Sequence, residues 1–325
     1  MQTLDRRISA GKLWIALGAA LLCASPASGA RRSERPLSNL QYEALPLERS
    51  RQNHLLVRAF INGKPALLGV DSGAPVSAIA IQRRHHFGLK PLPGSSKLPL
   101  RLNINGAFNN VAIAHTLRLG ALTLLDEPMV AVDLTNSSKA ARAHNEQEID
   151  GILGADILFP TKAVLDCHAQ VLVLKMDPDL PGPIPGFDFR GLRGVPLRVS
   201  AGYNLYVDGK INGAEAKLMV DTGAFTTLLH RRFVRRMKIP LRDTPFSSAG
   251  VNLKERGVQV ATIHRLSIGN VNFRRKEVGV MDLHGLIHDE LLDGSPPVAG
   301  LLGSEILRRH HGIIDFGTRT LYLQR

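Results

Sequence analysis

The strongest constraint on the fold of this chain is an internal duplication around a short acidic turn. One apolar run ends in Asp71-Ser72-Gly73-Ala74, and another ends in Asp221-Thr222-Gly223-Ala224, 150 positions later. Each run is typical of a buried strand, and the glycine after it allows a tight turn. A single Asp-Ser-Gly or Asp-Thr-Gly would be ordinary turn chemistry. Two of them in the same setting indicate that the turn belongs to a repeated unit.

Six further blocks repeat in the same order, first at an offset of 150 and then of 149. The paired blocks are Leu45-Pro46-Leu47 with Val195-Pro196-Leu197, Ile61-Asn62-Gly63 with Ile211-Asn212-Gly213, Leu117-Arg118-Leu119-Gly120 with Leu266-Ser267-Ile268-Gly269, Val130-Ala131-Val132-Asp133-Leu134 with Gly279-Val280-Met281-Asp282-Leu283, Ile152-Leu153-Gly154 with Leu301-Leu302-Gly303, and Val164-Leu165-Asp166 with Ile313-Ile314-Asp315. The period is far longer than that of a solenoid repeat, so each copy is expected to form a lobe.

The duplication divides the 325 residues into two lobes, 45–176 and 195–325, joined by a Pro- and Gly-rich linker at 177–194. A single large domain is the alternative that length alone leaves open. Residues 1–30 have the basic start, apolar core and small residues of a cleaved export signal, with Ala30 or Ala27 at the cleavage point. Residues 31–44 are expected to be a disordered lead-in. We therefore expect a periplasmic or secreted protein without a membrane span.

Each copy predicts the same coarse order of elements, and the 30 Gly and 19 Pro favour a mostly β architecture. A hairpin turns at Asn62-Gly63 or Asn212-Gly213, and its second strand delivers the acidic turn. Short helices are expected at 78–87 and 228–237. Alternating segments then predict a projecting hairpin, at 98–104 and 109–119 in the first copy and at 246–252 and 257–268 in the second. A helical turn and a last hairpin close each copy.

Several features that could indicate other functions have simpler interpretations. The net charge is +13, but the basic residues are scattered and aromatic residues are few, so nucleic-acid binding is not expected. Cys167 is the only cysteine after the signal, which excludes an internal disulfide, and its apolar surroundings predict a buried side chain. His115 and His264 match at an offset of 149, but no further ligand lies at metal-binding spacing. We expect no metal and no cofactor.

Two carboxylates on equivalent turns acquire a chemical role if a two-fold axis brings the lobes together. Asp71 and Asp221 would then face each other and hold one proton between them, because two adjacent negative charges are unfavourable. One carboxyl could act as a base toward water and the other as an acid toward a carbonyl. Ser72 and Thr222 could hydrogen-bond across the pair, and Gly73 and Gly223 would let backbone N–H groups approach it. We call Asp71 and Asp221 the dyad.

These motifs resemble those of the retropepsin-like aspartic proteases, here in two tandem copies like the two lobes of pepsin-like enzymes. The resemblance covers residues 45–176 and 195–325, and the acidic residues Asp156 and Glu305 are most similar to bacterial retropepsin-type domains. It implies a mostly β fold of two barrel lobes and an endopeptidase that cleaves peptides or proteins as a monomer. It also implies that the dyad is catalytic, and that two segments pack beneath it: Ile152, Leu153 and Gly154, and Leu301, Leu302 and Gly303.

The sequence departs from this family in the region that would cover the site. Neither candidate flap contains the Tyr of pepsin-like enzymes, and Gly106, Gly250 and Gly257 are the only candidates for a glycine-rich tip. Pro75 and Phe225, directly after the two turns, also differ between the copies. Two alternatives therefore stay open: a module that binds extended peptides in the same cleft without cleaving them, and a larger assembly in which lobes pair between molecules.

Overall fold

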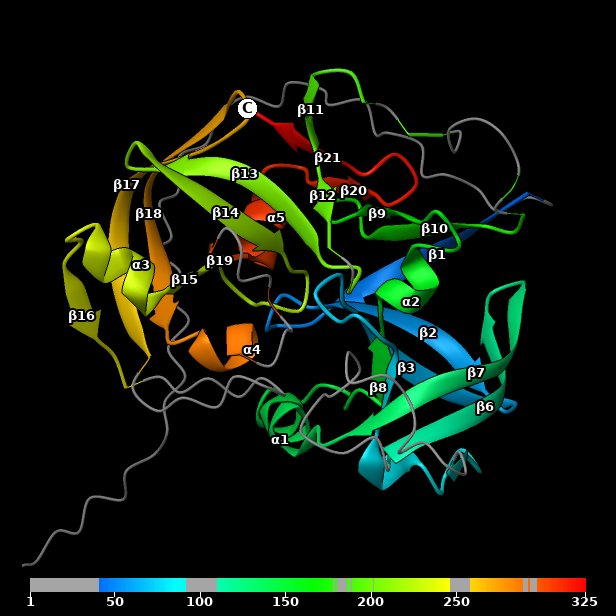
Figure 1. The fold of residues 1–325 in the computed structure, drawn as a ribbon. Coiled ribbons are helices and arrows are strands. Elements are labelled where there is room, and N and C mark those ends of the chain that lie inside the picture. Colours follow the sequence, from blue (N-terminus) through cyan, green and yellow to red (C-terminus); the bar gives the residue numbers. More distant parts are fainter. Residues whose placement is uncertain are drawn as a thin grey trace, which may run out of the picture. The chain divides into compact units, whose positions relative to one another are not determined.

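The apolar runs before the two acidic turns are the buried strands β3 (Lys64–Val70) and β14 (Ala214–Val220), one in each half of the chain (Figure 1). A computed structural model describes residues 41–91, 110–177, 179, 186–187, 189–200, 202–245, 258–288, 292 and 297–325. Residues 34–325 belong to one compact unit that contains both halves. The predicted signal, residues 1–30, lies outside the described residues and remains a prediction.

The first half contains ten strands and three short helices in the part that the structure describes. They are β1 (Tyr42–Arg49), β2 (Leu55–Ile61), β3, β4 (Ala78–Ala80), η1 (Ile81–Arg83), β5 (Lys90–Pro91), β6 (Val111–Leu119), β7 (Leu122–Val132), α1 (Thr135–Ala143), β8 (Gly151–Leu153), α2 (Ala155–Leu158), β9 (Val164–Asp166) and β10 (Val171–Lys175).

The second half repeats this order among its described residues. Its elements are β11 (Leu192–Pro196), β12 (Arg198–Val199), β13 (Leu205–Ile211), β14, β15 (Leu228–His230), α3 (Arg231–Arg236), β16 (Leu241–Asp243), β17 (Gln259–Ile268), β18 (Val271–Met281), α4 (His284–His288), β19 (Val298–Leu302), α5 (Ser304–Arg309), β20 (Ile313–Asp315) and β21 (Thr320–Gln324).

Each half closes six strands into a barrel. In the first lobe the order is β2-β3-β8-β4-β7-β6, and pairing of β6 with β2 closes the ring. The second lobe has the order β13-β14-β19-β15-β18-β17, closed by β17 with β13. The acidic-turn strand pairs in parallel with the strand of the apolar-apolar-Gly block in both lobes, β3 with β8 and β14 with β19. The predicted mostly β fold of two lobes is confirmed.

The two hairpin turns form as the sequence predicts. Asn62 and Gly63 have φ angles of 48° and 77°, and Asn212 and Gly213 have 49° and 91°. Positive φ at both central residues is the requirement of a type I′ turn, which Asn-Gly satisfies better than other dipeptides. Because the turn fixes the register of each hairpin, it also fixes where β3 and β14 end.

Six strands that continue the first-lobe sheet beyond β2 join the two lobes. Their order is β11-β21-β20-β9-β10-β1 (Figure 1). The first three strands come from the second half of the chain and the last three from the first half, and the halves meet where β9 pairs with β20. That antiparallel contact pairs Val164 with Asp315, Leu165 with Ile314 and Asp166 with Ile313. Leu165 and Ile314 are both fully buried. The lobes are therefore fixed to each other by backbone hydrogen bonds as well as by apolar packing.

The two expected helices begin later than the sequence pattern indicates. Residues 78–80 and 228–230, predicted to be helical, form the strands β4 and β15, and the helical segments start at Ile81 and Arg231. Ala78, Ile79 and Ala80 are buried because β4 fills the gap between β7 and β8. Their helix-compatible composition is thus overridden by tertiary pairing. The first helical segment is a 3-10 turn, whereas α3 is an α-helix, so the copies differ here.

Other predicted segments fall partly outside the described residues. The segments 98–104 and 246–252 of the projecting hairpins lie outside them, as do the candidate tip residues Gly106, Gly250 and Gly257. Positions 178, 180–185 and 188 of the predicted linker, 177–194, are also outside, and β11 starts within the linker at Leu192. Similarly, β1 begins at Tyr42, inside the predicted lead-in 31–44, because Tyr42 is buried and pairs with Lys175 of β10.

Candidate active site

Crossed hydrogen bonds lock the two acidic turns together. The hydroxyl of Ser72 donates to the carbonyl of Val220 at 2.9 Å, and that of Thr222 donates to the carbonyl of Val70 at 2.9 Å. Each hydroxyl oxygen also accepts the backbone N–H of the other residue, at 2.9 and 3.1 Å. Both side chains are fully buried. Since every donor in this exchange has a partner, the arrangement fixes the turns without leaving a buried polar group unsatisfied.

The dyad carboxyls meet directly above this crossed pair. The side chains of Asp71 and Asp221 lie close enough for each to shift the pKa of the other. Oδ1 of Asp71 also accepts the N–H of Gly73 at 2.8 Å. Oδ1 of Asp221 accepts the N–H groups of Gly223 and Ala224 at 2.9 and 3.0 Å. The two aspartates that the repeat pairs in sequence are thus brought together in space.

Each carboxyl packs against the glycine of the opposite turn. A Cβ on Gly73 would lie 2.7 Å from Cγ of Asp221, and a Cβ on Gly223 would lie 2.3 Å from Oδ2 of Asp71. Real Cβ atoms do not approach other atoms so closely, so any side chain here would push the carboxyls apart. The glycines are required for this close approach, as well as for the turns in which they lie.

The apolar-apolar-Gly segments lie next to the strands that end in the acidic turns. The carbonyls of Leu153 and Leu302 accept the N–H groups of Asp71 and Asp221, each at 3.0 Å. Gly154 packs so closely that a Cβ would lie 2.7 Å from the carbonyl carbon of Val76, and the equivalent contact at Gly303 would be 2.3 Å. Ile152 and Leu301 belong to the same strands, β8 and β19, and pair with Gly69 and Met219.

Half-buried acidic residues that follow these glycines hold the turns by hydrogen bonds. Asp156 accepts both the N–H and the hydroxyl of Ser77, each at 2.7 Å. In the second lobe Glu305 accepts the N–H of Thr227 at 2.8 Å. The Ser77 hydroxyl in turn accepts the N–H of Gly154 at 3.0 Å. Burial raises the pKa of both Asp156 and Glu305, and hydrogen bonds oppose that rise.

The electrostatics of the dyad favour a single shared proton. Burial raises the pKa of Asp71, although the N–H of Gly73 and the hydrogen bond to Asp221 act against the rise. Burial and then the charge of Asp71 raise the pKa of Asp221 well above its usual range. When one member ionises, the other is therefore harder to ionise. Both directions are those expected of a carboxyl pair that loses its first proton more easily than its second.

One residue close to the dyad was not singled out by the sequence. Burial lowers the pKa of His54, in the loop between β1 and β2, and the nearby charge of Asp71 and the backbone of Gly223 oppose that effect. Its signal lies in the repeat comparison: the equivalent position, 150 residues later, is Asn204. A histidine that breaks the symmetry of an otherwise matched loop could have been noticed there.

The remaining candidates do not join the site. His115 is exposed and pairs with Asp126 at 3.0 Å on the β6–β7 hairpin, and His264 is exposed on β17. Cys167 is buried, which strongly raises the pKa of its thiol and keeps it unreactive. Among the described residues no group of three or more His, Cys, Asp or Glu side chains is arranged to hold a metal ion.

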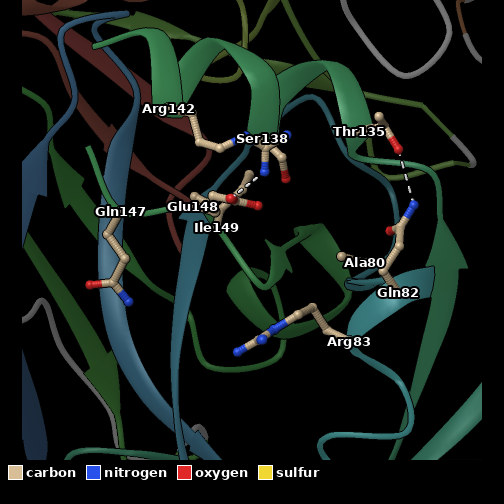
Figure 2. A pocket seen from close by; sticks show the side chains of 9 residues that line it. All are labelled: Ala80, Gln82, Arg83, Thr135, Ser138, Arg142, Gln147, Glu148 and Ile149. Atoms are coloured by element: carbon tan, nitrogen blue, oxygen red, sulfur yellow. Dashed lines mark hydrogen bonds and ion pairs between the residues drawn. The ribbon is translucent and has the colours of Figure 1, made fainter. Parts of the chain in front are cut away.

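A hollow of about 500 Å³ lies elsewhere on the first lobe, between η1 and α1 (Figure 2). Most of the residues that line it have polar side chains, with Gln82 hydrogen-bonded to Thr135 at 3.0 Å (Figure 2). Arg83 also pairs with the buried Asp150 at 2.6 Å, which holds the end of η1 against β3. Neither dyad residue lines this hollow, so it is separate from the candidate active site.

A family model described as aspartyl protease matches residues 57–157 and 207–306, one segment in each lobe. The chain belongs to the aspartyl protease family. Each matched segment contains one of the two acidic turns, so the family assignment covers both halves of the dyad. The predicted tandem arrangement of retropepsin-like units is confirmed.

Among solved structures, this aspartyl protease family member is similar to a retropepsin-like aspartic protease from Rickettsia conorii. The sequences are 22% identical, and the match covers 41% of this chain and 90% of that one with a TM-score of 0.30. No curated protein matches the chain. None of the helices in the described residues is long and apolar enough to cross a membrane.

Proposed function

We propose that this chain is an aspartic-type endopeptidase whose catalytic residues are Asp71 and Asp221. The observation that carries the proposal is the packing of each carboxyl against the glycine of the opposite turn, above the crossed Ser72–Thr222 pair. Family membership supports peptides or proteins as the substrate class. The shared proton supports acid and base roles for the two carboxyls in one step.

The proposed reaction uses water as the nucleophile. The ionised aspartate takes a proton from a water molecule as the water oxygen bonds to the carbonyl carbon of the scissile amide. The protonated aspartate gives its proton to the carbonyl oxygen, and a tetrahedral diol forms. When the diol collapses, the C–N bond breaks, the nitrogen receives a proton, and the dyad regains its single proton. No covalent intermediate with the enzyme is needed.

The internal duplication supports a self-contained enzyme. Both halves of the dyad come from one chain, and the β9–β20 contact joins the lobes without a second molecule. We therefore propose a monomer in which the lobes act as an intramolecular dimer. The apolar, basic-flanked N-terminus supports export to the periplasm or beyond, and the N-terminal sequence of protein recovered from the producing cells would test cleavage near Ala30.

The test is cleavage of an unfolded protein and of a peptide library between pH 3 and pH 8. Asp71→Asn and Asp221→Asn are each expected to reduce kcat by a factor of at least 10³, because each removes one partner of the proton exchange. Asp126→Asn is the matched control, since this carboxylate is exposed on a distant hairpin, and it should retain full activity. Cleavage that survives both dyad substitutions would refute the mechanism.

The alternative of a peptide-binding module predicts a different result in the same experiment. Peptides would bind to the wild type without being cleaved at any pH in this range. A statine-type mimic of the diol would then bind no better than an ordinary peptide. An endopeptidase should bind the mimic at least 10²-fold more tightly, because the mimic resembles the transition state.

A further inference from the structure

The hollow between η1 and α1 on the first lobe has the size of a small-molecule site. Its volume is about 500 Å³, which lies within the range of pockets that bind small ligands in proteins. Its walls come mainly from η1, α1 and the segment before β8, and Figure 2 shows Arg83 on the side opposite α1. Because neither dyad residue lines this hollow, the proposed peptidase function does not account for it.

A buried acid holds Arg83 in place. The Nε–H of Arg83 donates to Oδ1 of Asp150 at 2.6 Å, and Oδ2 of Asp150 accepts the N–H of Leu67 at 2.9 Å. Asp150 is only 5% exposed. In addition, Cζ of Arg83 lies 5.7 Å from the centre of the Phe87 ring, which is buried. The guanidinium is therefore oriented before any ligand arrives, which lowers the entropic cost of binding to it.

The acids of this region already have partners, whereas Arg83 keeps unused donors. Asp150 contacts Nε of Arg83, and the terminal amino groups of Arg83 make no hydrogen bond to any residue that the structure describes. Glu148, the one acid in the lining, is paired with Arg142 of α1. The side chain of Arg83 is 44% exposed, so a ligand in the hollow can reach it. The hollow therefore offers positively charged donors to a ligand.

The second lobe builds the equivalent place from apolar residues. At the repeat offset of 150, Phe233 stands where the first lobe has Arg83, and at the offset of 149, Ala299 stands where it has Asp150. Phe233 and Ala299 are both buried. The fold can thus fill this place without charges, and a buried ion pair seldom adds stability over apolar packing. The pair in the first lobe is therefore not a requirement of the fold.

We propose that this hollow binds an oxyanion, a carboxylate or phosphate group, through the two terminal amino groups of Arg83. A guanidinium binds such groups by two parallel hydrogen bonds, and the bond from Nε to Asp150 leaves the edge between the two amino groups for the ligand. Ala80 and Ile149, which also line the hollow, can contact the uncharged part of a larger ligand.

Isothermal titration calorimetry of the full chain with three probes tests the site. N-acetylleucine carries a carboxylate, its amide has the same body without the charge, and inorganic phosphate is the other oxyanion. At least one of the two anions should bind saturably with a Kd of about 1 mM or tighter, and the amide should bind at least about tenfold more weakly than that anion. The anion that binds identifies the group. No saturable binding of either anion, or an amide that binds as tightly, would overturn the proposal.

Paired substitutions locate the bound anion. Arg83→Gln with Asp150→Asn removes both charges together, so that no buried charge is left without a partner, and it should weaken anion binding at least about tenfold. The matched control is Arg58→Gln with Glu48→Gln, an exposed ion pair at 2.7 Å on the same lobe, which should leave anion binding unchanged. Unchanged binding in the first double variant, with a near-UV circular dichroism spectrum like that of the wild type, would place the anion elsewhere and overturn the proposal.

A single substitution keeps the test decisive if the double variant does not fold. Arg83→Lys retains a positive charge opposite Asp150 but lacks the planar pair of amino groups, so it should weaken anion binding by about three- to tenfold. The NMR signal of the Arg83 Nε–H, identified by its absence from Arg83→Lys, should shift during a titration of the wild type, whereas that of Arg58 should not. Wild-type affinity in Arg83→Lys, or an Arg83 signal that stays fixed while the anion binds, would overturn the proposal.

Discussion

Glu127 in β7 and Lys276 in β18 occupy equivalent positions in the two lobes. Although their charges are opposite, each lies near an acidic residue of its own lobe. Glu127 is close to Asp156, and Lys276 is close to Glu305. The first lobe therefore places two carboxyls together where the second lobe has a cation and a carboxyl. Burial, and then the charge of Asp156, raise the pKa of Glu127 to about 7. This mismatch should make the first lobe sensitive to pH.

The magnitude follows from the difference between the folded and unfolded states. A pKa of about 7 for Glu127 in the folded protein, against 4.5 in the unfolded chain, corresponds to about 3 kcal/mol at pH 8. Glu127 is half-buried, so screening by solvent reduces this to about 1–2 kcal/mol. Because the folded state binds the proton more tightly, the stability is fully present below pH 4.5 and is lost as pH rises through about 7.

Urea unfolding at pH 5 and pH 8 measures this effect. Between these pH values the wild type should lose about 1–2 kcal/mol more stability than Glu127→Gln, which has no charge to bury. Glu127→Lys should be at least as stable as Glu127→Gln at pH 8, because it recreates the pairing of the second lobe. The control is Glu215→Gln, an exposed carboxylate on β14. The same pH dependence in wild type and Glu127→Gln would refute the reasoning.

Three other predictions concern the contacts that hold the acidic turns and the burial of Cys167. Thr222→Val should destabilise the protein by about 2–4 kcal/mol in urea unfolding, because it leaves two buried hydrogen-bond partners unsatisfied. As a control, Thr123→Val at an exposed position should change the stability by less than about 0.5 kcal/mol. Gly303→Ala should cost at least about 3 kcal/mol or prevent folding, while Gly285→Ala, with open space around it, should be neutral by the same assay. The Cys167 thiol should react with a thiol reagent only after unfolding; rapid labelling of the native protein would contradict its burial.

The sequence predicts those parts of the fold that local chemistry determines. The Asn-Gly hairpins, the acidic turns and the segments beneath them each depend on a short motif, and the duplication places them in register. The strand β4 could not be predicted in this way, because Ala78–Ala80 has no strand pattern of its own and becomes a strand only between β7 and β8. Short segments of this kind take their conformation from their neighbours.

The candidate site, like the fold, could be predicted from the sequence only in part. The repeat indicates that Asp71 and Asp221 belong together, but their close approach depends on how the lobes pack. A single histidine at the end of a loop carries no motif, so only its mismatch with Asn204 in the repeat could have drawn attention to His54. That His54 lies near the acidic turns depends on the packing of the lobes.

The register of the β9–β20 contact has a consequence for how the two halves of this chain can diverge in evolution. Val164 pairs with Asp315, and Asp166 pairs with Ile313. Since the repeat relates Val164 to Ile313 and Asp166 to Asp315, each of these two pairs is the symmetry equivalent of the other. The contact is therefore self-complementary, as the interface of a symmetric homodimer must be. In a homodimer every substitution occurs twice, once on each side of the substrate. Fusion of the two halves into one chain removes that coupling, so the two copies can diverge independently, as His54 and Asn204, or Pro75 and Phe225, already do.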